Sequence, residues 1–158
     1  MTEPKALRGW RRVSGTAFGR WLFSRLVCFK APYFSSIRPV LDVLEPGRAV
    51  ARMRKRRAVT NHIGTVHALA MANLCEFVAG TMTEVSIPRS MRWIPRGMQI
   101  EYLGKAGTGV QAVGTLAPVR EGEKQDAVVS VDVTDDAGNR VVHADITMYV
   151  TPRPRPDA

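Results

Sequence analysis

One stretch near the middle of the chain restricts the possible folds more than any other. Residues 66–79 read Val-His-Ala-Leu-Ala-Met-Ala-Asn-Leu-Cys-Glu-Phe-Val-Ala, a run that is rich in good helix formers. In a helix these apolar side chains fall all round the axis, and such a helix is expected to be buried on every side. We therefore predict a central helix surrounded by a sheet. Thr65 is the expected N-cap, and Gly80 is expected to end the helix or to open its last turn.

Three polar side chains interrupt this helix: His67, Asn73 and Glu76. An ionised carboxylate is costly to bury without a partner, so Glu76 has two interpretations. In the structural one it pairs with an arginine of a neighbouring strand. In the functional one it lines a cleft as a general base or nucleophile. Asn73 lies one turn earlier on the same side and could orient Glu76 or cap a loop carbonyl, while a lone histidine such as His67 is more often structural.

A polar, glycine-containing loop leads into the predicted helix. Backbone N–H groups at a helix start are unpaired and carry the positive end of the helix dipole, which suits a developing oxyanion. We expect Gly64, Thr65 and Ala68 to supply this environment. His62 and His67 are five residues apart and lie on different faces, and no third ligand has suitable spacing, so we expect no metal site.

The segments after Pro88 favour an antiparallel sheet, because apolar and polar residues alternate along them. The predicted fold class is α+β, an antiparallel sheet of five or six strands wrapped round one long central helix, over residues 45–151. Residues 1–44 are expected to form an amphipathic helical arm, and residues 152–158 a disordered tail. The predicted strands are residues 48–58, 98–103, 110–119 with a possible bulge at Gly114, 127–134 and 142–150.

The positive charge is concentrated at the front of the chain. The net charge is +9, but residues 1–60 carry 14 basic and 3 acidic residues, whereas residues 61–158 carry 9 basic and 11 acidic residues. An arginine-rich lobe attracts polyanions such as nucleic acid, anionic lipid or the phosphates of a nucleotide-bearing ligand, and it can also be a plain solvated surface. No known nucleic-acid-binding motif accompanies the arginines, so no nucleic-acid partner is expected.

Two cysteines, Cys28 and Cys75, are too few for a disulfide framework. This favours a reducing compartment, most simply the cytoplasm. Cys75 has no evident base beside it, so we interpret it as an inert core thiol rather than a nucleophile. No apolar run reaches about 18 residues, so no membrane-spanning helix is expected.

With these residues in place, the chain resembles the hotdog-fold acyl-CoA thioesterases, in the neighbourhood of the phenylacetyl-CoA and 4-hydroxybenzoyl-CoA thioesterases. In that pattern an Asn precedes a His-Gly-Gly by six residues, and an acid follows the His by nine. Asn61, His67 and Glu76 keep those spacings, although Ala68-Leu69 replaces the double glycine and Glu76 the commoner Asp. The resemblance is clearest to an uncharacterised domain-of-unknown-function branch with the pattern Asn-His-x-Gly-Thr-x-His-Ala-x-Ala, and the stretch 92–98 followed by Tyr102 also fits it.

The resemblance implies a homodimer or homotetramer that hydrolyses an acyl thioester of coenzyme A or of a carrier protein. Glu76 would act as base or nucleophile, Asn61 would hold the substrate or the attacking water from the partner subunit, and His67 would fix the loop or help to bind the thioester. Coenzyme A would enter as part of the substrate, with no other cofactor. Further candidates are Arg89, Arg92 and Arg96 for the coenzyme A phosphates, and Met71, Phe77 and Met98 for the acyl pocket.

The second hypothesis is a non-catalytic protein that binds an acyl chain or an acyl-CoA. Its basic N-terminal arm would dock on a membrane or on a partner, which the positive charge together with Trp10, Trp21 and Phe29 favours. In the simpler interpretation the arm packs against its own domain or against a sister subunit.

Overall fold

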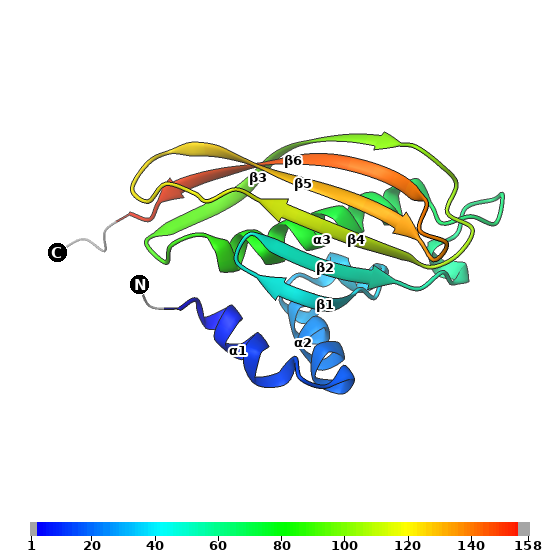
Figure 1. Ribbon diagram of the computed structural model, residues 1–158, viewed down its shortest axis with the longest axis horizontal. Helices are drawn as coiled ribbons and strands as arrows, with labels where there is room; N and C mark the ends of the chain where they lie inside the picture. The colour runs from blue at the N-terminus through cyan, green and yellow to red at the C-terminus, as the bar shows by residue number, and fades with distance from the viewer. Residues whose placement is uncertain (1–2, 155–158) are drawn as a thin grey trace.

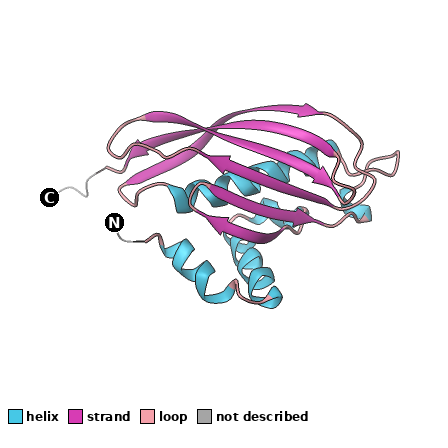
Figure 2. Ribbon diagram, in the orientation of Figure 1, coloured by secondary structure: helices cyan, strands magenta, loops and turns pink. Residues whose placement is uncertain are grey.

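The computed structural model describes residues 3–154. Six antiparallel strands form one sheet in the order β1-β2-β4-β5-β6-β3, and it wraps round the long helix α3, as the sequence predicts (Figures 1 and 2). The strands are β1 Val40–Glu45, β2 Arg48–Met53, β3 Met91–Tyr102, β4 Val110–Leu116, β5 Gln125–Asp135 and β6 Arg140–Pro152. The helices are α1 Lys5–Val13, α2 Ala17–Lys30 and α3 Ala68–Ser86, with short 3-10 turns η1 Pro32–Ser36 and η2 Arg57–Val59.

The central helix α3 begins later and runs further than the sequence indicates. Its N-cap is His67, whose imidazole accepts a hydrogen bond from the Leu69 N–H at 3.1 Å, so the prediction of Thr65 as the cap is wrong. Gly80 lies inside the helix rather than near its end. A Cβ added at Gly80 would lie 3.1 Å from the indole of Trp93, so this glycine makes room for packing between α3 and β3.

The helix approaches the sheet tightly at Gly114 in β4. A Cβ added at Gly114 would lie 2.6 Å from a methyl group of Val78 and 3.4 Å from Met82, both on α3. Gly114 pairs in register with Ala49 and Val131, so the strand ladder runs through it without the expected bulge. The missing side chain therefore allows α3 to lie close on the sheet, rather than kinking the strand.

The sheet begins earlier in the chain than the sequence indicates. Residues 40–45 form β1, which pairs with β2 through a hairpin whose Gly47 has a φ of 81°. The helical arm expected over residues 1–44 is therefore wrong for its last part. The run Val-Leu-Asp-Val-Leu is rich in residues that suit a half-buried strand, and Leu41 and Leu44 are buried.

The helices α1 and α2 pack along the outer edge of β1 (Figure 1). The Ser24 hydroxyl on α2 accepts a hydrogen bond from the Leu41 N–H of β1 at 2.9 Å. Trp10 on α1 is buried, and its ring meets that of Phe23 edge-on with centroids 5.3 Å apart. The N-terminal helices are thus part of the domain, as the simpler interpretation of the arm expects.

The strand β3 forms the other edge of the sheet and is longer than the predicted strand at 98–103. It pairs with β6, with a shift in register between Pro95 and Gly97. Within residues 3–154 its opposite edge has no partner strand. Large apolar side chains are exposed on or just after this strand, namely Ile94, Met98, Tyr102 and Leu103.

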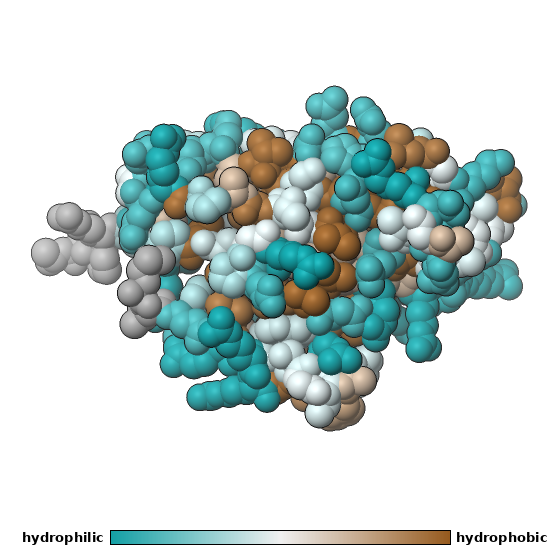
Figure 3. Space-filling model, viewed as in Figure 1, coloured by the Kyte–Doolittle hydropathy of each residue, from teal (hydrophilic) through white to brown (hydrophobic). Residues whose placement is uncertain are grey.

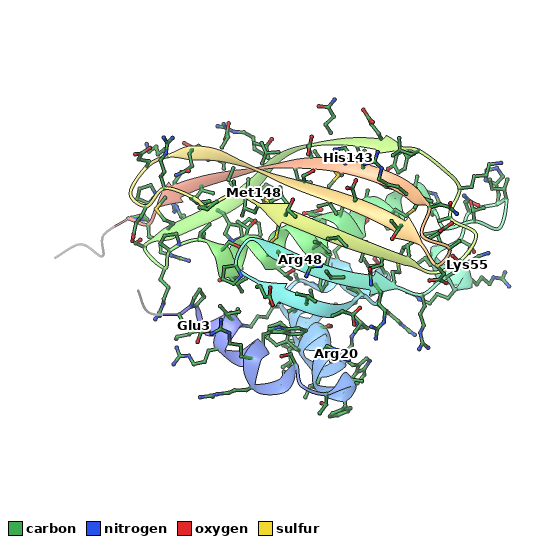
Figure 4. The ribbon with its side chains drawn as sticks, viewed as in Figure 1. Glu3, Arg20, Arg48, Lys55, His143 and Met148 are labelled. Carbon is green, nitrogen blue, oxygen red and sulfur yellow. The ribbon has the colours of Figure 1, made fainter. Side chains whose placement is uncertain are left out.

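Along β5 and β6, buried apolar residues on the inner face of the sheet alternate with mostly polar residues on the outer face. The outer face is turned towards the viewer in Figure 3 and mixes hydrophilic with hydrophobic residues. His143 on β6, labelled in Figure 4, lies 2.8 Å from a carboxylate oxygen of Asp132 and 3.7 Å from one of Asp145. The hydrogen bond with Asp132 raises the pKa of His143 above its ordinary value. This face is therefore a solvated surface and not part of the core.

The C-terminal strand β6 extends to Pro152, and the Arg153 N–H donates to the Ser90 carbonyl at 2.7 Å. The expected disordered tail over residues 152–158 is therefore wrong for its first residues, and its part 155–158 lies outside the described residues. Among the helices that the structure describes, none is both long enough and apolar enough to cross a bilayer.

We expect Gly114→Ala to destabilise the fold, because the new methyl group must displace Val78. Overpacking of this kind lowers the free energy of unfolding by about 1–3 kcal/mol, which urea denaturation measures. Gly107→Ala is the matched control: nothing lies within 4 Å of a Cβ built there, so we expect a change within about 0.5 kcal/mol. Equal losses in the two variants would contradict the close helix–sheet contact.

Candidate functional site

One strip of α3 is left open by the sheet. Leu69, Ala72, Glu76, Gly80 and Glu84 follow one another at three- or four-residue spacing and therefore share one face of the helix. Leu69 is 68% exposed, and Ala72 and Glu76 are half-buried, whereas the face towards the sheet is buried. The expectation that the helix is buried on every side is thus wrong, and the open strip is where its chemistry can reach a ligand.

Glu76 lies near the middle of this strip. Its carboxylate forms no ion pair with any of the residues 3–154, and we find no side-chain hydrogen bond to it in that range. No contact among residues 3–154 therefore supports the structural interpretation, in which Glu76 forms a salt bridge to an arginine of a neighbouring strand. A half-buried carboxylate without a cation beside it is available to accept a proton or to attack a carbonyl.

The strand β3 covers the far end of the strip. The Trp93 indole lies against Gly80, and its N–H donates to the Glu84 carboxylate at 2.9 Å. The Trp93 indole therefore lies over the part of the strip beyond Glu76, while Glu84 itself stays exposed. Sequence reasoning did not assign Trp93 to the site, and the only signal was the stretch 92–98 that the family resemblance singled out.

On another side the helix is tied to η1. The Asn73 amide donates to the Ser36 hydroxyl at 3.2 Å, and the ring of Phe34 meets that of Phe77 edge-on at 5.3 Å. Asn73 therefore anchors α3 to η1, and no hydrogen bond to Glu76 supports its expected orienting role. Its Oδ1 is buried and has no hydrogen-bond partner in the described part of the chain. Such an acceptor is costly to leave unpaired, so it is open to a donor from outside the chain.

The loop before α3 is held by one side chain. Asn61 Oδ1 accepts from the N–H groups of Ile63 and Thr65 at 3.1 and 3.0 Å, and Asn61 Nδ2 donates to the Thr65 hydroxyl at 2.8 Å. Gly64 has a φ of 77°, which only glycine adopts readily, and its N–H donates to the Asn61 carbonyl. The N–H groups of Gly64 and Thr65 are therefore already used, which corrects their expected role as oxyanion donors.

Within residues 3–154, one backbone N–H at the start of α3 has no acceptor. The His67 N–H donates to the Val59 carbonyl at 2.8 Å, and the Leu69 N–H donates to the His67 imidazole. From Ile63 to Leu69, Ala68 alone has a backbone N–H without an acceptor in residues 3–154. This N–H lies at the positive end of the helix dipole and suits a developing oxyanion.

A single chain does not bring these groups together. A helix rises about 1.5 Å per residue, so Ala68 and Glu76 lie about 12 Å apart along the axis of α3. One thioester carbonyl cannot contact both of them. Asn61, His67 and Glu76, which the family resemblance groups in one site, therefore occupy two separate places in each chain.

The arginines expected to bind phosphate differ in how they are held. Arg96 donates to the Asp126 carboxylate at 2.9 and 3.0 Å and lies 4.2 Å from the centre of the Tyr149 ring, which holds it on the outer face of the sheet. Arg92 donates to the Thr151 hydroxyl at 3.3 Å. All of these contacts are exposed, so a ligand can compete for the guanidinium groups.

Arg89 lines a cleft of about 380 Å³ at the end of α3, together with Lys5, Arg153 and Glu84. A second cleft of about 440 Å³ lies between residues 52–55 and 109–111. Neither cleft is lined by Glu76, which lies on an open surface of the single chain.

Two of the three residues expected in the acyl pocket are packing residues. Met71 is buried and Phe77 is fully buried in the core, so the structure corrects their assignment. Met98 is 37% exposed and lies on β3 beside the buried Ile146, on the inner face of the sheet. It is the one of the three that a ligand can reach.

The thiols take no part in this site. Burial raises the pKa of Cys75 to about 12, which confirms its interpretation as an inert core thiol. Burial also raises the pKa of Cys28. Neither thiol forms a disulfide.

The architecture is that of the hotdog-fold thioesterase superfamily, and solved structures share it. A thioesterase from Haemophilus influenzae is 12% identical, with a TM-score of 0.69 over 80% of this chain and 87% of that one. A probable thioesterase from Pseudomonas aeruginosa is 21% identical, with a TM-score of 0.75 over 82% and 93%. A hypothetical thioesterase from Streptococcus pneumoniae, solved with coenzyme A, is 21% identical, with a TM-score of 0.61 over 74% and 91%. At these identities the likeness concerns the fold alone.

Sequence comparisons narrow the class to a family. The structural-genomics target APC5556 is 41% identical, with a TM-score of 0.82 over 94% of this chain and 99% of that one. Acyl-coenzyme A thioesterase 13 of Homo sapiens and of Pongo abelii is 30% identical over 97 residues, which are 61% of this chain and 68% of each relative. The family described as a domain of unknown function, DUF4442, matches residues 19–150, and the chain belongs to it.

We expect Asn61→Ala to loosen the loop before α3, because it removes three side-chain hydrogen bonds. At about 1 kcal/mol for each bond, the free energy of unfolding falls by about 2–3 kcal/mol in urea denaturation. His62→Ala, at the exposed neighbouring position, is the control and should stay within about 0.5 kcal/mol. Full stability in Asn61→Ala would show that the loop is held in another way.

Proposed function

We propose that this chain is an acyl-CoA thioesterase that hydrolyses an acyl thioester to a free acid and a thiol. The observation that carries the proposal is Glu76, a half-buried carboxylate on the open strip of α3, unpaired within residues 3–154. Membership of the hotdog thioesterase superfamily and the relatives called acyl-coenzyme A thioesterase 13 support the reaction class. The Streptococcus pneumoniae structure with coenzyme A supports coenzyme A as the thiol.

In the general-base form of the reaction, Glu76 takes a proton from a water molecule as the water oxygen attacks the thioester carbonyl carbon. The carbonyl oxygen becomes an oxyanion that accepts a hydrogen bond from the Ala68 N–H at a helix start. The carbon–sulfur bond then breaks, and the thiolate leaves with the proton that Glu76 holds. The carboxylate is regenerated, and the products are the acid and free coenzyme A.

In the nucleophilic form, the Glu76 carboxylate attacks the same carbonyl carbon and expels the thiolate, which leaves a mixed anhydride on the enzyme. Water then hydrolyses the anhydride and restores the carboxylate. Both forms need the same placement of Glu76 and of the oxyanion donor, and neither needs a cofactor, because coenzyme A enters as part of the substrate.

The complete site takes its parts from two copies of the chain. The distance of about 12 Å between Ala68 and Glu76 along one helix requires that a carbonyl meeting Glu76 finds its oxyanion donor on a second chain. β3 is a long edge strand with exposed Ile94 and Met98, and edges of this kind are normally covered. Pairing of two β3 edges in a homodimer covers both strands. In this arrangement Asn61 and His67 of one subunit hold the loop whose helix start faces Glu76 of the other.

The phosphates of coenzyme A have two candidate arginines near one end of α3. Arg89 and Arg92 are exposed, and Arg89 shares its cleft with two more cations, Lys5 and Arg153. Planar guanidinium groups bind phosphate in a bidentate way, which favours arginine here.

Two free thiols and no disulfide among the described residues agree with a reducing compartment such as the cytoplasm.

A second candidate function is the binding of an acyl-CoA without hydrolysis. The observation in its favour is that Ala68-Leu69 takes the place of the family's paired glycines, because side chains there leave less room for a thioester. A pure binding protein would retain acyl-CoA on gel filtration and release no thiol. The experiment on Glu76 separates the two functions.

Glu76→Gln is expected to lower kcat/KM for acyl-CoA hydrolysis by about 10²- to 10⁴-fold, because it removes the base or nucleophile. Thiol release from a panel of acyl-CoAs measures this. Glu84→Gln is the matched control. Glu84 lies on the same strip two turns later, and its carboxylate already accepts a hydrogen bond from the Trp93 indole. The kcat/KM of this variant should therefore stay within about threefold of the wild-type value. A loss of less than about tenfold in Glu76→Gln, or no turnover by the wild type, would refute the catalytic role.

Ala68→Pro is expected to lower kcat by about 10²- to 10³-fold, because it removes the proposed oxyanion donor. The fold should tolerate it: Ala68 is the first helical residue, its N–H has no acceptor within residues 3–154, and His67 has a φ of −66° and a ψ of 138°, which suit a following proline.

A mixing experiment then tests whether two chains build each site. A hybrid dimer of one Ala68→Pro chain and one Glu76→Gln chain keeps one intact site when the groups come from different subunits. Co-expressed chains should then recover about half of the wild-type kcat per hybrid dimer. Hybrids as inactive as their parents would place both groups of a site in one chain.

A further inference from the structure

The helix α2 has an outer face that the domain does not use. Its inner face is buried against β1 and α1, with Gly19, Ser24 and Cys28 inside. Six large apolar side chains recur on the opposite side at helical spacing and continue into η1, with exposed fractions from 38% to 85%. We call them the α2 stripe: Phe18, Trp21, Leu22, Leu26, Phe29 and Tyr33.

The α2 stripe is a continuous apolar surface. The rings of Phe18 and Trp21 stack with their centroids 5.7 Å apart. Arg25 lies on the same face of α2, between the residues of the stripe, and its guanidinium donates to the Pro39 carbonyl. Monomeric proteins rarely expose an apolar patch of this kind unless it meets a partner.

The N-terminal segment that carries the α2 stripe is strongly basic. Residues 1–41 contain eight basic residues and one acidic residue, Glu3, which pairs with Arg11 at 2.6 Å. On α1 the exposed Arg8 and Arg12 are four residues apart and share one face. In Figure 4, α1 and α2 lie at the bottom of the molecule, beyond β1, and their side chains project outward from there.

We propose that the α2 stripe docks on an anionic lipid bilayer. The helix lies in the plane of the interface, with the rings of Phe18, Trp21 and Phe29 among the acyl chains and headgroups, and the cations of α1 against the lipid phosphates. A helix of 14 residues is about 21 Å long, too short to span the apolar core, so it lies on the surface.

Charge decides between a bilayer and a second copy of the chain as the occupant. Two copies facing each other through α2 would oppose two segments with eight basic residues and one acidic residue each, which repel. An anionic bilayer supplies the apolar interior for the rings and the negative charge for the arginines. The hydrogen bond from the Leu41 N–H to Ser24 already fixes α2 on the domain, so little ordering is needed on docking.

The test is co-sedimentation of the full chain with vesicles of phosphatidylcholine alone or mixed equally with phosphatidylglycerol. We expect binding to the mixed vesicles that weakens as NaCl is raised, and little binding to phosphatidylcholine alone. Phe18→Ser with Phe29→Ser should lower the partition coefficient by at least about tenfold, because two exposed rings no longer bury apolar area. Val128→Ser, at an exposed apolar position on the outer face of the sheet, is the matched control and should bind like the wild type.

A charge-matched pair of variants tests the electrostatic part. Arg8→Gln with Arg12→Gln should weaken binding by about fivefold for each charge removed. Lys105→Gln with Lys124→Gln removes the same charge from loops of the sheet and should leave binding nearly unchanged. Equal losses in the two pairs would show attraction by net charge alone and would refute docking through α1 and α2.

Fluorescence locates the contact. Trp21 is 46% exposed, whereas Trp10 is buried, so vesicle binding should shift the emission to shorter wavelength through Trp21. Trp21→Phe should keep most of the binding and lose the shift. Absence of binding to the mixed vesicles, or a dimer in solution that the Phe18 and Phe29 changes dissociate, would overturn the proposal. Hydrolysis of acyl-CoA should be unchanged in all these variants, so this result is independent of the proposed function.

Discussion

The structure depends on the contact between α3 and the sheet. The helix can approach β4 because Gly114 leaves space for Val78, and the inner residues of the neighbouring strands pack round the same side of the helix. A sheet can surround only part of a cylinder, so one strip of α3 remains uncovered. Glu76 is on that strip, and its partial burial follows from the packing rather than from a cavity built for it. The position of the candidate site therefore follows from which side of α3 the sheet covers.

Periodicity made most of this fold predictable, and the failures have local causes. The alternation in β4, β5 and β6 and the apolar run of α3 are strong patterns that the sheet and helix confirm. The sequence does not indicate β1 because residues 40–45 come directly after a helical, proline-containing segment. Only their pairing with β2 in the folded chain identifies them as a strand. The cap was misassigned because a polar Thr65 suits an N-cap, yet its hydroxyl and N–H are both taken by Asn61. Tertiary contacts decided both cases.

For the candidate site, the sequence singled out residues whose roles stay predictions, and the structure shows contacts that spacing alone does not reveal. Glu76 was recognisable because a carboxylate in an apolar helix is costly and therefore informative. The three hydrogen bonds that Asn61 makes inside its own loop could not be inferred from spacing, and nor could the tie from Asn73 to Ser36. Glu76 follows His67 by nine positions, most of them along α3, and for this reason we propose that a shared reaction centre takes its parts from two chains.

The two edges of the sheet differ in how far the chain itself covers them, and the two proposed partners follow from this difference. On β1 the outward N–H of Leu41 is satisfied by Ser24 of α2, so that edge is closed by the chain itself. The inner face of α2 is thereby committed to the domain, and its apolar outer stripe is left for something other than strand pairing. On β3 no such cover exists within residues 3–154, and Ile94 and Met98 are exposed. We propose a second chain as the partner of this uncovered strand edge and a lipid surface as the partner of the basic, aromatic face of α2. Because the two surfaces lie on opposite edges of one sheet, a dimer joined through β3 leaves the α2 stripe of each subunit free to meet a membrane.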